Sequence, residues 1–199
     1  MILNHLWGLY ASPKSEWQEI DKQHESYAYP ISHIAIIALI PAICSYFASA
    51  QIGWSIGVGD TIKLTHESAL FMSMGMYLGL MVGVFSLAIM IHDLAEVFDA
   101  KPSMTQSLEL AAYTATPLFM VGFACLFPEL WFICMVGLVG LAYSVYLLYS
   151  GVPILMHIPE EKGFIYSSTV VTCGLVLLSI LMAVSVILLN SGSGIIYTS

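Results

Sequence analysis

The sequence predicts an all-α, polytopic membrane protein: a bundle of five transmembrane helices preceded by a short N-terminal amphipathic helix. Charged residues make up 9% of the chain and hydrophobic residues 59%. A soluble domain carries about 25% charged residues, so this chain cannot cover a soluble surface. Residues 68–91 are 24 consecutive residues without a charge. A run of that length is long enough to cross the bilayer core as a helix.

Charge and the motifs present argue against a nucleic-acid partner, a cleaved signal peptide and an enzymatic activity. The chain has five lysines, no arginine and a net charge of −8, which argues against a nucleic-acid partner. The first residues lack a basic region before an apolar core, so we expect no cleaved signal peptide. There is no nucleophile–base pairing, phosphate-binding loop or cofactor motif. An enzyme is therefore the least expected class.

Residues 1–30 are expected to form a cytoplasmic amphipathic segment. Ser12 and Pro13 are typical of a helix start, and Pro30 closes the segment. Apolar and aromatic residues then recur at helical spacing among charged ones: Trp17, Ile20, His24 and Tyr27. Such a helix lies on the lipid bilayer or against the bundle.

Residues 31–190 are expected to form the membrane domain, with 191–199 as a short tail. The five predicted spans cover residues 31–50, 68–91, 108–127, 130–155 and 164–189. Pro41 and Pro117 fall inside the first and third spans. Each removes a backbone hydrogen bond, so we expect a kink at both positions.

Small residues at regular spacing predict where helices approach closely. Gly75, Gly79 and Gly83 are four residues apart in the second span. A similar series occurs in the fourth span at seven-residue spacing: Gly137, Ser144 and Gly151. Either stripe suits close packing within the chain or a homo-oligomer.

The four cysteines lie in apolar stretches, where a thiol most often serves as a small packing residue. Cys125 and Cys134 flank one short turn at similar depth, so the sequence leaves open whether they form a disulfide.

An acidic cluster at the end of the second span is the first candidate site. Asp93 falls beside the glycine stripe, and His92, Glu96 and Asp99 lie one to seven residues away. A carboxylate costs about 2.5–3.5 kcal/mol at the bilayer centre, so it needs a partner, a proton or an ion. Carboxylates with an imidazole suit a divalent metal ion. The alternative is that residues 94–99 have left the membrane and are solvated.

The third span carries a second candidate, a path for cations. Glu109, Tyr113 and Thr116 share one helix face, and Pro117 frees the Tyr113 carbonyl. The alternative is a kinked helix whose polar groups bond to its neighbours.

Histidines near the predicted span ends are candidates of lower priority. The pair His66–Glu67 opens the second span and suits an entry site on the outer side, although such a pair is more often interfacial. His33 and His157 are also expected at the interface.

Several motifs together make the chain resemble the Yip domain family in its short bacterial form. They are Pro13-x-x-x-Trp17-x-x-Ile20, Tyr113-x-x-x-Pro117, Pro128 and the run from Gly137 to Gly151 that contains Tyr143 and Tyr146. The resemblance implies five helices and a cytoplasmic N-terminus. Eukaryotic members have Asp-Leu-Tyr-Gly-Pro before the first span, where this chain reads SYAYP. That departure argues against a GTPase partner.

Lysine placement agrees with the orientation that the resemblance implies. In a five-span chain one side carries Lys14, Lys22, Lys101 and Lys162, and the other only Lys63. Cytoplasmic loops are richer in lysine and arginine. We therefore expect a bacterial inner-membrane protein with its N-terminus in the cytoplasm and its C-terminus outside.

Two functions remain open at the level of sequence. The first is transport or conduction of cations, either divalent metal ions or proton-coupled, through the acidic residues of the second and third spans. The second is a non-transporting membrane organiser that oligomerises through its glycine stripes and binds partners or lipid with its N-terminal helix. No cofactor is expected beyond a candidate divalent metal ion.

Overall fold

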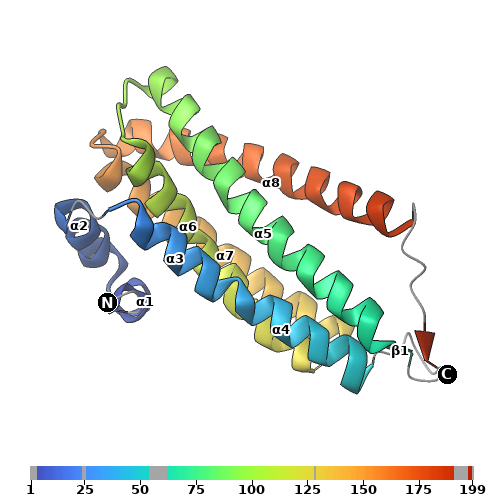
Figure 1. The fold of residues 1–199 in the computed structure, drawn as a ribbon. Coiled ribbons are helices and arrows are strands. Elements are labelled where there is room, and N and C mark those ends of the chain that lie inside the picture. Colours follow the sequence, from blue (N-terminus) through green and yellow to red (C-terminus); the bar gives the residue numbers. More distant parts are fainter. Residues whose placement is uncertain (1–3, 24–25, 54–61, 128, 191–196, 199) are drawn as a thin grey trace.

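The computed structural model describes the chain except residues 1–3, 24–25, 54–61, 128, 191–196 and 199. Within the described residues, five helices are long and apolar enough to cross a membrane (Figure 1). They are Ala28–Ile52, His66–Phe98, Met104–Leu126, Leu130–Leu155 and Glu160–Ile187. The predicted fold class, an all-α membrane bundle, is confirmed, and each span overlaps the range expected from the sequence.

The N-terminal segment forms two helices, where the sequence indicated one. Helix α1 (Asn4–Ala11) precedes α2 (Pro13–Gln23), and α2 packs against the fourth span. Trp17 and Ile20 of α2 are fully buried. The hydroxyl of Tyr143 donates to the Leu9 carbonyl at 2.9 Å and so fixes α1 as well. The amphipathic helix therefore lies against the helical bundle and not on the lipid surface, the other position that the sequence allowed.

The first span is broken into α3 (Ala28–Ile37) and α4 (Leu39–Phe47), followed by a π-helical turn, Ala48–Ile52. The break lies at Ala38, three residues before Pro41. Pro41 has no N–H for the Ile37 carbonyl, which gives the break its physical cause.

The second and fifth spans are the long helices α5 (His66–Ala95) and α8 (Glu160–Asn190). A short 3-10 turn, Glu96–Phe98, extends α5, and the Thr65 hydroxyl caps its start. Strands β1 (Lys63–Leu64) and β2 (Tyr197–Thr198) pair antiparallel just before α5. The tail therefore returns to the loop that precedes the second span.

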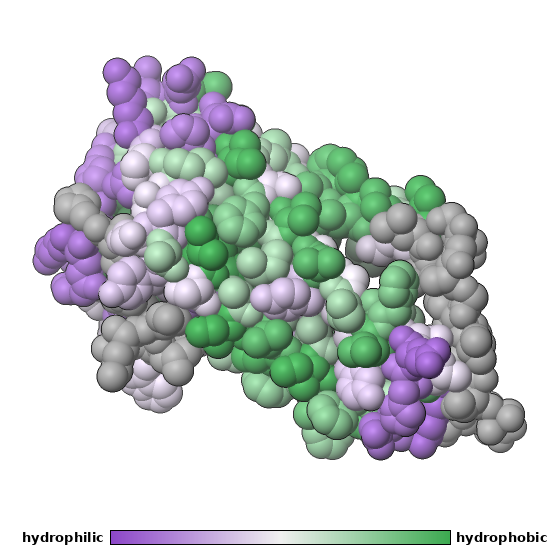
Figure 2. All heavy atoms as spheres, viewed as in Figure 1, coloured by the Kyte–Doolittle hydropathy of each residue, from purple (hydrophilic) through white to green (hydrophobic). Residues whose placement is uncertain are grey.

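Helix α6 (Met104–Met120) is the centre of the bundle and contacts α3, α5 and α7 (Leu130–Leu155). In its most apolar window 72% of residues are buried, against 6% for α8. Pro117 lies inside α6, which tightens into a 3-10 helix, Val121–Leu126. Apolar side chains cover the middle of the visible surface, and polar ones gather at its two ends (Figure 2). Such a distribution suits a bilayer.

The glycines predicted to line helix seams divide into two groups. A Cβ added at Gly75, Gly79 or Gly137 would meet no atom within 4 Å, whereas one at Gly83 would lie 3.1 Å from Leu181. Gly151 lies against Trp17, and Ser144 is buried. These stripes therefore supply only part of the internal packing.

Two close approaches between spans use glycines that the sequence analysis did not single out. A Cβ at Gly122 would lie 2.5 Å from the Pro41 Cα, and one at Gly140 would lie 2.4 Å from a Val121 methyl.

All four cysteines are free thiols, so Cys125 and Cys134 form no disulfide.

Candidate functional site

Four polar side chains of the first and third spans are buried inside the bundle, and we call them the polar core: His33, Glu109, Tyr113 and Thr116. His33 and Glu109 are only 1% and 2% exposed. The spacing of the three α6 residues, four and then three positions, places them on one face of that helix. The sequence placed His33 at the interface, which is wrong, because α3 packs against α6 and covers it.

The contacts inside the polar core define which atom carries a proton. His33 Nε2 lies 2.9 Å from Thr116 Oγ1, and the Thr116 hydroxyl donates to the Ala112 carbonyl at 3.1 Å. A hydroxyl has one proton to donate, so Thr116 accepts from His33 and Nε2 carries the hydrogen. The His33 ring also lies 4.7 Å from the Tyr113 ring, centroid to centroid.

The amphipathic helix α2 covers the polar core. Trp17 meets Tyr113 edge to face, with ring centroids 6.2 Å apart. Gly151 has no side chain and leaves room for the indole, because a Cβ there would lie 2.7 Å from it. Within the described part of the chain, the buried Trp17 Nε1 has no hydrogen-bond partner. A spare donor therefore lies next to the cluster.

The polar core extends from one end of α6 towards the middle of the bilayer. At a rise of about 1.5 Å per residue, Glu109 lies about 8 Å and Thr116 about 18 Å along the helix from Met104. The hydrocarbon core is about 30 Å thick. The cluster is thus placed to connect the α2 end of the bundle with its interior.

A network of side chains holds α2 at this end. Asp21 Oδ2 lies 3.0 Å from His157 Nε2, and Gln106 Nε2 lies 3.5 Å from the other Asp21 oxygen. Gln106 also completes a capping box with Ser103 at the start of α6. The position of α2 is therefore coupled to the start of the central helix. His157 is exposed, as expected of an interfacial residue.

The acidic cluster at the end of α5 is not assembled into a metal site. Asp93, Glu96 and Asp99 are exposed, and His92 is half-buried. Asp99 pairs instead with Lys162, its Oδ2 lying 2.6 Å from Nζ. Among the described residues, no three His, Cys, Asp or Glu side chains are grouped closely enough to hold a metal ion. The cause is local: the helix tightens at Glu96, and Asp99 adopts a left-handed conformation.

The pair His66 and Glu67 opens α5 directly after β1, at the opposite end of that helix from the acidic residues (Figure 1). His66 Nδ1 lies 3.1 Å from the Tyr46 hydroxyl, and Glu67 is exposed. His66 therefore contacts a tyrosine of the first span, and an entry site at this pair stays a prediction.

Comparison with known proteins identifies the family. The Yip1 domain model matches residues 7–181. The chain is 35% identical to inner membrane protein YohC of Escherichia coli K12 over 96% of its own length and 98% of the relative's. The same figures hold for YohC of Escherichia coli O6:H1 strain CFT073. No solved structure gives a significant match. The chain is therefore an integral inner-membrane protein and belongs to the Yip1 domain family.

Proposed function

We propose that this protein carries protons, alone or coupled to a cation, through the polar core. The observation that supports the proposal is the burial of a carboxyl group, Glu109, and an imidazole, His33, within the spans. Ionisable side chains are costly in a membrane and, where they occur, usually serve transport or proton relay. A proton passes between neighbouring groups without the wide hydrated path that a divalent ion needs.

The chemistry of the polar core fits such a relay. The His33 imidazole can hold a proton on either ring nitrogen, and its Nε2 lies 2.9 Å from the Thr116 hydroxyl, a group that can both accept and donate a hydrogen bond. Tyr113 lies against the His33 ring and one helical turn from Glu109, and its hydroxyl can both donate and accept. Trp17 of α2 covers the polar core, so we expect movement of α2 to control the access of protons to it.

Proteoliposomes with an internal pH-sensitive dye and an imposed potential test this proposal. We expect proton uptake by the wild type and its loss in Glu109→Gln, which keeps the shape but cannot ionise. His33→Gln should behave alike. Asp93→Asn is the matched control: its carboxylate is exposed and should leave the flux unchanged.

Two outcomes would overturn the proposal. One is wild-type vesicles that take up no protons, with or without a divalent metal ion in the buffer. The other is a flux that survives Glu109→Gln in correctly folded protein. Loss of flux in Asp93→Asn but not in Glu109→Gln would show that protons pass at the acidic end of α5 and not through the polar core.

The organiser function remains a second candidate because two glycines of α5 pack against no atom within the described chain. Gly75 and Gly79 have open space where a side chain would lie, and the neighbouring Leu78 is exposed. Another copy of the helix could approach this face closely. Mass measurement in nanodiscs should give a dimer or larger assembly that Gly79→Leu dissociates. A monomeric wild type would exclude it.

The orientation that we propose has the N-terminus in the cytoplasm. Helix α2, which contains Lys14 and Lys22, and the start of α8, which contains Lys162, lie at one end of the bundle, and strand β1, which contains Lys63, lies at the other (Figure 1). A C-terminal alkaline phosphatase fusion should be active, because that enzyme works only outside the cytoplasm. A fluorescent protein fused at the same position should stay dark.

A further inference from the structure

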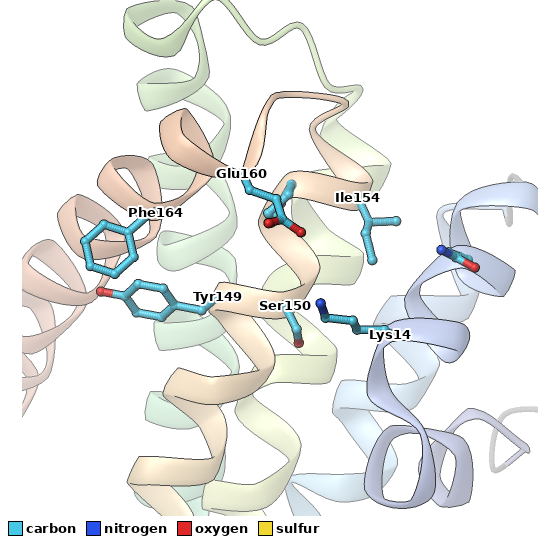
Figure 3. Close-up of a pocket in the computed structure, with 8 residues that line it drawn as sticks. Lys14, Tyr149, Ser150, Ile154, Glu160 and Phe164 are labelled. Atoms are coloured by element: carbon cyan, nitrogen blue, oxygen red, sulfur yellow. The ribbon is translucent and has the colours of Figure 1, made fainter.

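A cavity between α2, α7 and α8 is separate from the polar core. Its volume is about 420 Å³, and it is lined by Lys14, Gln18, Tyr149, Ser150, Pro153, Ile154, Glu160 and Phe164 (Figure 3). The fifth spanning segment begins at Glu160, and Phe164 is 63% exposed. The cavity therefore lies where a span ends, at the level of the lipid headgroups, and its α8 side faces the bilayer.

The cavity carries one charge of each sign on opposite walls. Lys14 of α2 extends towards Ser150, while the carboxylate of Glu160 enters from the start of α8 (Figure 3). Among the described residues, neither of these side chains forms an ion pair. The side chains thus offer a cation with a neighbouring hydroxyl to a phosphate, and an anion to an ammonium group.

The wall towards the bilayer is aromatic and fixed in place. The Tyr149 and Phe164 rings lie 5.3 Å apart, and the Tyr149 hydroxyl is 2.7 Å from the Ser168 hydroxyl. Aromatic side chains with one polar end are typical of the membrane interface. An acyl chain leaving the cavity would pass along this wall into the hydrocarbon.

We propose that this cavity binds a zwitterionic phospholipid with a primary ammonium, phosphatidylethanolamine. Lys14 and Ser150 hold the phosphate, and Glu160 accepts hydrogen bonds from the ammonium. Phosphatidylglycerol offers the same phosphate to Lys14, but its headgroup ends in a neutral glycerol that brings no positive charge to the Glu160 carboxylate. Phosphatidylcholine carries a methylated ammonium that has no N–H to donate. The lipid would also join α2 to α8, because both helices line the cavity.

Native mass spectrometry of the full chain in detergent tests the proposal. Phosphatidylethanolamine, phosphatidylglycerol and phosphatidylcholine with the same acyl chains are added in equal amounts. We expect phosphatidylethanolamine to be retained in preference to the other two. A lysine near the membrane surface is worth about 1 kcal/mol, so Lys14→Gln should weaken its binding about fivefold.

Glu160→Gln gives the sharper result. It should lower phosphatidylethanolamine binding and leave phosphatidylglycerol binding unchanged or stronger, so the ratio of the two falls about fivefold. Lys22→Gln on α2 and Glu161→Gln on α8 are matched controls, because neither residue lines the cavity. Each variant is first shown to melt at the wild-type temperature.

Several results would overturn the proposal. They are a wild-type preference for phosphatidylglycerol, equal retention of phosphatidylethanolamine and phosphatidylcholine, or an equal loss in the control variants. Competition by soluble glycerophosphoethanolamine as strong as that by the lipid would show that a free headgroup compound is the occupant instead. Proton flux through the polar core is not required for any of these outcomes.

Discussion

His33 Nε2 lies 2.9 Å from the hydroxyl oxygen of Thr116, although the two residues are 83 positions apart in the chain. This hydrogen bond joins the first span to the third inside the bundle. Hydrogen bonds between membrane helices contribute about 0.6 kcal/mol on average and about 1.7 at most.

A double-mutant cycle measures this bond. Thr116→Val keeps the shape but removes the acceptor, and His33→Phe removes the donor. Combined, the two should cost less than the sum of the single changes, by about 0.6–1.7 kcal/mol. Unfolding in mixed detergent gives the free energies. Strict additivity would mean that the bond contributes nothing.

Gly122 packs against the backbone of Pro41, and we expect Gly122→Ala to lower the free energy of unfolding by about 1–3 kcal/mol. The added methyl would lie 2.5 Å from the Pro41 Cα, and a backbone atom cannot move aside as a flexible side chain can. Gly137→Ala is the control, since a Cβ there meets nothing within 4 Å. A neutral Gly122→Ala would argue against the close approach of the first and third spans.

Trp17 anchors α2, so Trp17→Ala should destabilise the protein by about 3–5 kcal/mol and expose the N-terminal segment to protease. Gly151→Val should have a similar effect from the opposite side, because its side chain would occupy the place of the indole. Timed proteolysis followed by N-terminal sequencing checks both. Trp7→Ala provides a control, as that side chain is 80% exposed. Equal cleavage of all three variants and the wild type would contradict the prediction.

Lys162 lies beside Asp99 and lowers the pKa of that carboxyl through a hydrogen bond and through its charge. A lowered pKa in the folded state stabilises the protein above the unfolded pKa of about 3.9, and the stabilisation is lost as pH falls through the folded value. The melting temperature of Asp99→Asn should therefore lie below that of the wild type at neutral pH. The difference should shrink in acid.

The control for this titration is Asp93→Asn. Asp93 is exposed on the same helix end and forms no ion pair among the described residues. Its substitution should leave the melting temperature at neutral pH as in the wild type, because no ion pair is lost. A gap between Asp99→Asn and wild type that widened in acid would refute the assignment.

The arrangement of spans could be predicted from the sequence because length and hydropathy decide whether a segment crosses a bilayer. The apolar face of α2 could also be predicted, because Trp17 and Ile20 recur at helical spacing. Helix α1 could not be predicted in this way, because Asn4–Ala11 has little contrast between a polar and an apolar face. Its position depends on distant contacts such as the one with Tyr143.

The candidate site was predicted in part. Glu109, Tyr113 and Thr116 could be grouped because they lie on one helix, where spacing alone gives the face. His33 could not be added, because its neighbours belong to another span. Spacing is also a weak guide to the acidic residues at the end of α5, because periodicity holds only while the helix continues, and this one tightens at Glu96.

The central position of α6 has a consequence for how the protein is made. Its most apolar window has a mean hydropathy of 1.4, the lowest of the five spans, against 2.7 for α8. A segment that carries a carboxylate and several hydroxyls gains little by entering lipid alone. We therefore expect the insertion machinery to release α6 into the bilayer only together with a neighbouring span. The more apolar outer helices would then enter the lipid before α6 takes its place at the centre of the bundle.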